Sequence, residues 1–201
     1  KALYLAKEKG KNRHIIYEER LHGKLETDDM QDMAMAYAVS KEKKRETITE
    51  MITKLCVSGV NAIVKNEERL QQIRSLFDLD GITIFSDRGS NLVCRNGNYM
   101  AEAPDGRPGF EDEGYLALFG DDGIFVESNM IKLRSQNPAA YAVTQEQEVG
   151  AALQCLSRKE GIPYTMVSFE VFNRNRKWSD EDVTLLTLLG HCIGNLLNYS
   201  E

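Results

Sequence analysis

Cysteine is scarce in this sequence, and its placement excludes two common uses. The 201 residues contain no CxxC pair, and none of the three histidines stands at a ligand spacing from a cysteine. A zinc site or a disulfide framework is therefore not expected, and reduced thiols are the default interpretation. The four cysteines are Cys56, Cys94, Cys155 and Cys192.

The sequence also has no long apolar run and no excess of positive charge. The nearest approach to such a run, residues 183–197, is interrupted by threonine, glycine, histidine and asparagine, so no membrane span or signal peptide is expected. The formal net charge is −6, with 25 Lys and Arg against 31 Asp and Glu. Nucleic acids and anionic membranes need a basic surface, so neither is an expected partner. These features predict a soluble, cytoplasmic protein.

Proline is absent from residues 1–80, which also hold only three of the 15 glycines. Because glycine and proline mark turns, this part is predicted to be mostly helical, and residues 81–201 to form a turn-rich sheet with helices. Apolar residues spaced three and four apart predict amphipathic helices up to Phe77, interrupted near Gly59 and Asn66. Short strands are predicted at 82–85, 91–95, 124–127, 152–157 and 165–172, followed by a last helix that opens at Ser179.

The first 17 residues resemble the C-terminal end of a GGDEF (diguanylate cyclase) domain. That family ends in a helix and a strand with the pattern ALYxAKxxGK/RN, which here is Ala2-Leu3-Tyr4, Ala6-Lys7 and Gly10-Lys11-Asn12. The resemblance implies that Lys7 and Lys11 derive from residues that contact the phosphates of GTP. The signature loop of the family does not occur in this sequence, so we expect no catalytic residues and no enzymatic activity in this chain. The parent protein would be a diguanylate cyclase.

Residues from about 45 to 201 resemble a GAF domain, the small-molecule-sensing and dimerising module of signalling proteins. The resemblance rests on the entry helices, the segment 81–85, the hairpin around Gly161 and the run from Trp178 to Asp182 into the last helix. It implies an α+β fold: a GAF-like antiparallel sheet with helices packed on one face, preceded by a helical linker. The expected organisation is a GGDEF remnant at 1–25, the linker at 26–44 and the GAF domain at 45–201.

The GAF resemblance implies a ligand pocket between the sheet and the loops that cover one face. Aromatic residues and a cysteine at inward strand positions and in the covering segment are the candidate lining; the alternative is that they only fill the core. Between residues 99 and 127 there are eight acidic residues and one arginine, which favours a neutral or cationic ligand. The candidates are Phe85, Cys94, Tyr99, Tyr115, Phe119, Phe125 and Phe169.

A second expectation is a homodimer held by helices. Ile48, Ile52, Leu55 and Ile63 have the spacing of a helix seam. The function expected is therefore a sensory or regulatory domain that binds a small molecule or mediates dimerisation, and so controls an adjoining diguanylate cyclase in cyclic di-GMP signalling.

Two alternatives stay open at this point: a structural dimerisation module without a ligand, and a thiol-dependent reductase of free methionine sulfoxide. The reductase would need Cys94 and Cys155 as a reacting pair, with their Cα atoms within about 7 Å. No metal site or cofactor is evident in the sequence, so the cofactor stays unknown.

Overall fold

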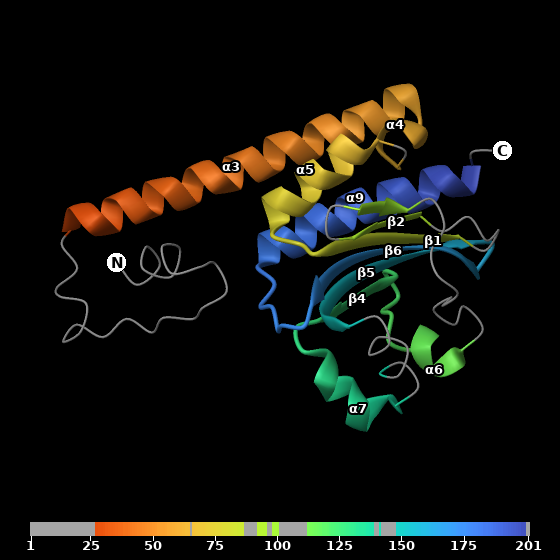
Figure 1. Cartoon of the computed structure of the whole chain (residues 1–201). Helices are drawn as coiled ribbons and strands as arrows, with labels where there is room; N and C mark the ends of the chain where they lie inside the picture. The colour runs from red at the N-terminus through yellow and green to blue at the C-terminus, as the bar shows by residue number, and fades with distance from the viewer. Residues whose placement is uncertain are drawn as a thin grey trace. The chain divides into compact units, whose positions relative to one another are not determined.

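The computed structural model describes residues 27–64, 66–86, 92–95, 98–100, 112–138, 141 and 148–199 (Figure 1). The chain divides into two compact units, residues 1–45 and 46–201. The expected GGDEF remnant, with Lys7 and Lys11, lies outside the described residues. In the part of the chain that the structure describes, no helix is long and apolar enough to cross a membrane.

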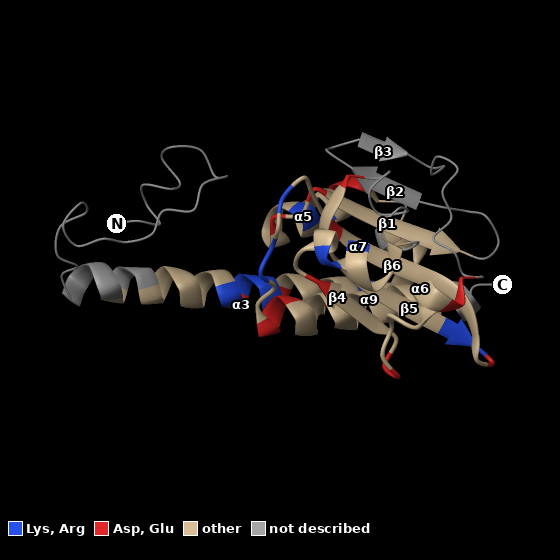
Figure 2. Ribbon diagram, turned by 90° about the horizontal axis from the view of Figure 1, so that it is seen from below, with Lys and Arg blue, Asp and Glu red and all other residues tan. Residues whose placement is uncertain are grey.

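Residues 27–77 are mostly helical, as predicted. Helix α3 (Thr27–Ser58) is followed by the short α4 (Asn61–Val64) and by α5 (Glu67–Phe77). Gly59, at φ +78°, ends α3, and the Asn66 side chain caps α5 by accepting a hydrogen bond from the backbone N–H of Arg69. Both predicted interruptions are confirmed. Four of the five residues at 41–45 of α3 are Lys or Arg, and they form a basic stretch of this helix (Figure 2).

The second unit is built on a six-stranded antiparallel sheet in the order β3-β2-β1-β6-β5-β4. The strands predicted from the sequence are confirmed, and β3 is an additional one. Positive φ values at Glu160 and Gly161 form the tight turn between the two long central strands. The bounds are β1 (Gly81–Ser86), β2 (Leu92–Arg95), β3 (Asn98–Met100), β4 (Ile124–Glu127), β5 (Val149–Lys159) and β6 (Ile162–Phe172).

The two faces of this sheet carry different layers (Figure 1). One face packs against α5, the last turns of α3 and α9 (Asp180–Tyr199), and holds the larger apolar core. The other face is covered by α6 (Glu113–Leu116), the 3₁₀ helix η1 (Met130–Lys132) and α7 (Leu133–Gln136), over a smaller apolar cluster. The predicted α+β fold class is confirmed, with the long helices on one face.

Two glycines of helix α9 face the sheet and leave no room there for a side chain. The Ser179 hydroxyl accepts from the backbone N–H of Asp182 at 3.1 Å, so the predicted capping pattern forms. A Cβ at Gly190 would lie 2.7 Å from the Cys155 Sγ and 3.3 Å from the Phe169 ring, and one at Gly194 would lie 2.3 Å from the Ser157 Oγ. The absence of a side chain at these two glycines therefore allows the helix to approach β5 and β6.

Residues of the predicted dimer seam pack into the apolar core of their own domain. Ile48 and Leu55 are 1% and 0% exposed and belong to the apolar core under α3. Ile52 is half-buried against the same core, and the side chain of Ile63 lies outside the described ones. The three-four spacing therefore marks the helix face that packs on its own domain, and Ile48 and Leu55 are not available to a second copy.

Gly190→Ala is expected to destabilise the protein although alanine favours helices. Relief of the glycine penalty contributes up to about 1 kcal/mol, whereas forcing a methyl group against packed core atoms costs about 1–3 kcal/mol. Urea unfolding should therefore show a net loss of stability. Asn195→Ala, at an exposed position of the same helix, is the control and should be neutral or slightly stabilising. A Gly190→Ala protein more stable than the parent would contradict the close packing of α9.

Candidate functional site

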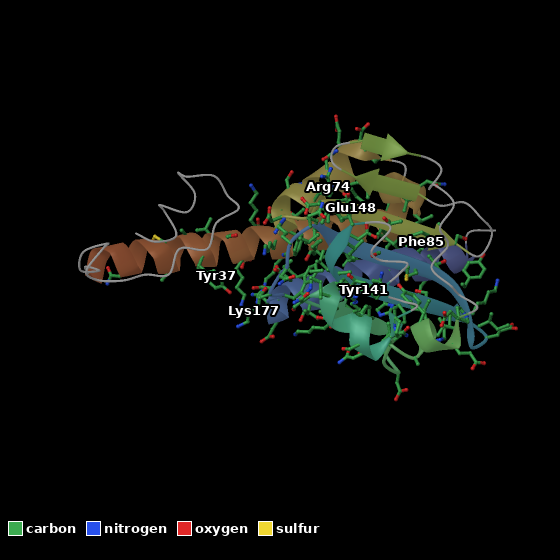
Figure 3. All side chains as sticks on the ribbon, turned by 60° about the horizontal axis from the view of Figure 1, so that its bottom comes forward. Tyr37, Arg74, Phe85, Tyr141, Glu148 and Lys177 are labelled. Carbon is green, nitrogen blue, oxygen red and sulfur yellow. The ribbon has the colours of Figure 1, made fainter. Side chains whose placement is uncertain are left out.

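The face of the sheet opposite α9 carries an apolar cluster with aromatic side chains. Phe85 of β1, labelled in Figure 3, Phe125 of β4 and the covering residues Tyr115 and Phe119 are all buried there. The Tyr115 and Phe119 rings meet edge to face at 5.7 Å between centroids, and Phe119 and Phe125 lie 5.9 Å apart. Four of the seven predicted pocket residues are thus brought together.

Phe169 was predicted to join them, and this prediction is wrong. It is fully buried in the core on the α9 face, next to Gly190. Side chains alternate along β6, so Met166 and Phe172 face the aromatic cluster, whereas Phe169 and Val171 face the helices. The side chains of Cys94 in β2 and Tyr99 in β3 lie outside the described ones.

Buried polar side chains share the face of the aromatic cluster. Their positions follow from strand register: Thr83 pairs with Ser168, and Ser168 pairs with Gln154, so the three form a row across β1, β6 and β5. Glu170 occupies the next row of β6. All four are at most 4% exposed. A central strand buried on both faces rarely carries such groups unless they are hydrogen-bonded.

These polar groups form two hydrogen-bonded sets. The Tyr115 hydroxyl donates to the Gln154 Oε1 at 2.6 Å, and the Gln154 Nε2 donates to the Ser168 Oγ at 3.2 Å. The Thr83 hydroxyl donates to the Glu170 Oε2 at 3.1 Å. Burial raises the pKa of the Tyr115 phenol; the bond to Gln154 opposes the rise and the charge of Glu170 adds to it. The phenol therefore stays a neutral donor at physiological pH.

Sequence reasoning missed these four polar residues because it selected aromatic ones. The signal was present in β6, where Ser168 and Glu170 alternate with Val167, Phe169 and Val171. Polar residues two apart in an apolar strand identify one face of a sheet. The same observation would have placed Phe169 on the opposite face.

The geometry excludes the thiol pair that the reductase alternative requires. Cys94 lies on β2 and Cys155 on β5, with β1 and β6 between them. Three strand spacings amount to about 14 Å, twice the reach of a disulfide. Cys155 is fully buried under α9, and burial raises the pKa of its thiol to about 12. A thiol in this setting is a packing group, since the thiolate is the reactive form.

Comparison with known proteins gives a fold but no family assignment from sequence. No family model matches the chain, and no curated protein matches it. Among solved structures, the chromophore-binding domain of the Stigmatella aurantiaca bacteriophytochrome matches with a TM-score of 0.57 at 15% identity, over 78% of this chain and 60% of that one. The corresponding domain of a bacteriophytochrome from R. palustris matches with a TM-score of 0.58 at 13% identity, over 80% and 64%.

The GAF domain of a phosphoenolpyruvate-protein phosphotransferase from Acinetobacter matches over 94% of its own length and 79% of this chain, with a TM-score of 0.51 at 11% identity. The chain therefore has the GAF fold, as the resemblance implied. It spans less than two thirds of each of the two phytochrome chains above. At these identities the likeness concerns the fold alone.

Tyr115→Phe is expected to lower the free energy of unfolding by about 1–2 kcal/mol. The change removes the hydroxyl that contacts the Gln154 Oε1 at 2.6 Å and the Met166 Sδ at 3.7 Å, and it leaves the buried Gln154 Oε1 without this donor. Chemical denaturation should show this loss. Tyr37→Phe, at a side chain that is 64% exposed, is the control and should change stability little (Figure 3). Equal changes in the free energy of unfolding for the two variants would mean that the hydrogen bond of the Tyr115 hydroxyl does not stabilise the fold.

Proposed function

We propose that this chain is a sensory and regulatory part of a longer signalling protein. Residues 46–201 bind a small molecule on the sheet face covered by α6, and binding changes the output of an adjoining diguanylate cyclase. The observation that carries this proposal is the buried polar and aromatic cluster, which lies beneath the one-turn helix α6 in a GAF fold. The resemblance of residues 1–17 to the end of a GGDEF domain supports the cyclase as the output.

The test of this output uses the whole gene product that contains these residues, beside the 201-residue chain alone. Cyclic di-GMP formation from GTP should occur in the whole protein and be absent from the chain. Disturbing the polar row with Ser168→Val should change the cyclase rate, whereas Ser58→Val, at an exposed position at the end of α3, should leave it unchanged. GTP turnover by the chain alone, or a cyclase rate insensitive to Ser168→Val in a folded protein, would contradict the proposal.

Dimerisation belongs to the same proposal, through a part of α3 other than the seam predicted from the sequence. Residues 34–40 are exposed all round, and they include Met35 and Val39, one helical turn apart and 69% and 64% exposed. A helix segment without packed neighbours is only marginally stable in water, and pairing with a second copy would bury both side chains. The ligand-free dimerisation module remains the second candidate function, because this helix would serve it equally well.

The chain is therefore expected to be a dimer in light scattering at micromolar concentrations. Met35→Glu/Val39→Glu should give a monomer because it places charges in the paired surface. Ala36→Glu/Ser40→Glu adds the same charge at the same spacing on a neighbouring face and should leave the mass unchanged. A monomer mass for the parent chain would refute the dimer.

A further inference from the structure

Two cysteines lie on long helices that cover the same face of the sheet (Figure 1). Cys56 is in the last turn of α3 and is exposed, and Cys192 is in the second half of α9 and is half-buried. Both are free thiols, and both belong to the unit formed by residues 46–201. Cys155, by contrast, is fully buried beneath α9. Among the cysteines whose side chains the structure describes, Cys56 and Cys192 are therefore the ones that a reagent in solution can reach.

The apolar core shared by α3 and α9 brings these two cysteines to one region. Leu55, next to Cys56, and Ile193, next to Cys192, are buried in the same cluster. Ile52 packs against that cluster, and so does Cys192 itself. Residues four apart lie on one side of a helix, so Ile52 and Cys56 share a flank of α3 that borders the core.

The electrostatics of Cys192 agree with this placement. Burial raises the pKa of the Cys192 thiol, and negative charge on Cys56 raises it further. Charges near a protein surface are largely screened from each other beyond about 10 Å. The effect of Cys56 on Cys192 therefore indicates that the two sulfur atoms are neighbours. At neutral pH Cys192 is a protonated thiol, whereas Cys56 is the member of the pair that is open to solvent.

We propose that Cys56 and Cys192 form a reversible disulfide that ties α3 to α9 when the protein meets a hydroperoxide. The Cys56 thiolate attacks the O–O bond, which gives a sulfenic acid at Cys56 and releases an alcohol, or water from hydrogen peroxide. The Cys192 sulfur then attacks the Cys56 sulfur, the S–S bond forms and water leaves with the Cys192 proton. The two thiols lose two electrons, and the peroxide gains them.

The position of Cys56 suits this step. A disulfide needs Cα atoms within about 7 Å of each other. Cys56 lies three residues before Gly59, which ends α3 at φ +78°, and the ends of helices fray more readily than their interiors. This last turn can therefore adjust to bring the Cys56 sulfur onto Cys192, while Leu55 keeps the helix on the core.

The disulfide would act as a redox-sensitive tie. Reduced thiols are the default state of this chain, and a disulfide that forms only under oxidation is typical of redox sensing. Oxidation would fix the end of α3, the helix that begins at Thr27, to the last helix of the domain. The tie does not depend on a small-molecule ligand, because both cysteines lie on helices of the face opposite Tyr115.

The test treats the reduced 201-residue chain, freed of reductant, with a small excess of hydrogen peroxide. The mass of the denatured chain should fall by two hydrogen atoms, and peptide mapping without reductant should join Cys56 to Cys192 within one chain. Dithiothreitol should restore the original mass. The oxidised chain should unfold at a higher urea concentration than the reduced one, because the cross-link closes a long loop in the unfolded state.

Three variants make the result specific. Cys192→Ser should stop at the sulfenic acid of Cys56, which dimedone labels, and Cys192→Ala replaces it if the serine variant does not fold. Cys56→Ser/Val57→Cys keeps the number of thiols but moves the exposed one about 100° round α3, and it should form no link to Cys192. Unreactive thiols, a sulfenic acid in the parent chain without a link to Cys192, a link between the Cys56 residues of two chains, or an equal link in the moved-thiol variant would each overturn the proposal.

Discussion

The two-residue period of β6 is the constraint on which the rest of this domain depends. The strand is paired on both sides and covered on both faces, so each of its side chains is committed to one of two different layers. Val167, Phe169 and Val171 join the core beneath the long helices. Ser168 and Glu170 stand on the opposite face with hydroxyl, amide and phenol partners. A shift of one residue in register would exchange the two sets and leave the carboxylate in an apolar core.

A chain segment after β6 connects these two layers. The backbone N–H of Arg176 donates to the carbonyl of Ser128 at 3.0 Å, and the Trp178 indole N–H donates to the carbonyl of Glu127 at the end of β4. The Arg176 guanidinium stacks on the Trp178 ring at 4.3 Å and pairs with Asp182 in the first turn of α9 at 3.0 Å. These contacts join the end of β4 to the start of α9. This is the physical route by which the proposed ligand face would reach the helices.

Much of the fold could be predicted from the sequence, because turn residues and helix periodicity report local structure. Gly161 and its neighbours located the hairpin, and Gly59 and Asn66 located the breaks between helices. What packs against each face of a helix or strand could not be predicted in the same way. The spacing of three and four around Leu55 describes a helix face but not its partner, so a face that packs on its own core was predicted to be a dimer seam. Phe169 was misplaced because aromatic character was weighed above the alternation that Ser168 and Glu170 define.

The buried polar side chains of this domain therefore lie on one face of the sheet, where apolar packing alone would not require them. The face that packs against α3, α5 and α9 is filled by aliphatic and aromatic side chains and by glycines that admit α9. On the opposite face a carboxylate, an amide and two hydroxyls are buried. Burying each of these groups lowers the stability of the fold unless the group is hydrogen-bonded. Of the two faces, the second has the shorter helices α6 and α7 as its cover and carries the buried polar side chains. The buried polar side chains and the short covering helices thus lie together on one face of the sheet, opposite the larger apolar core.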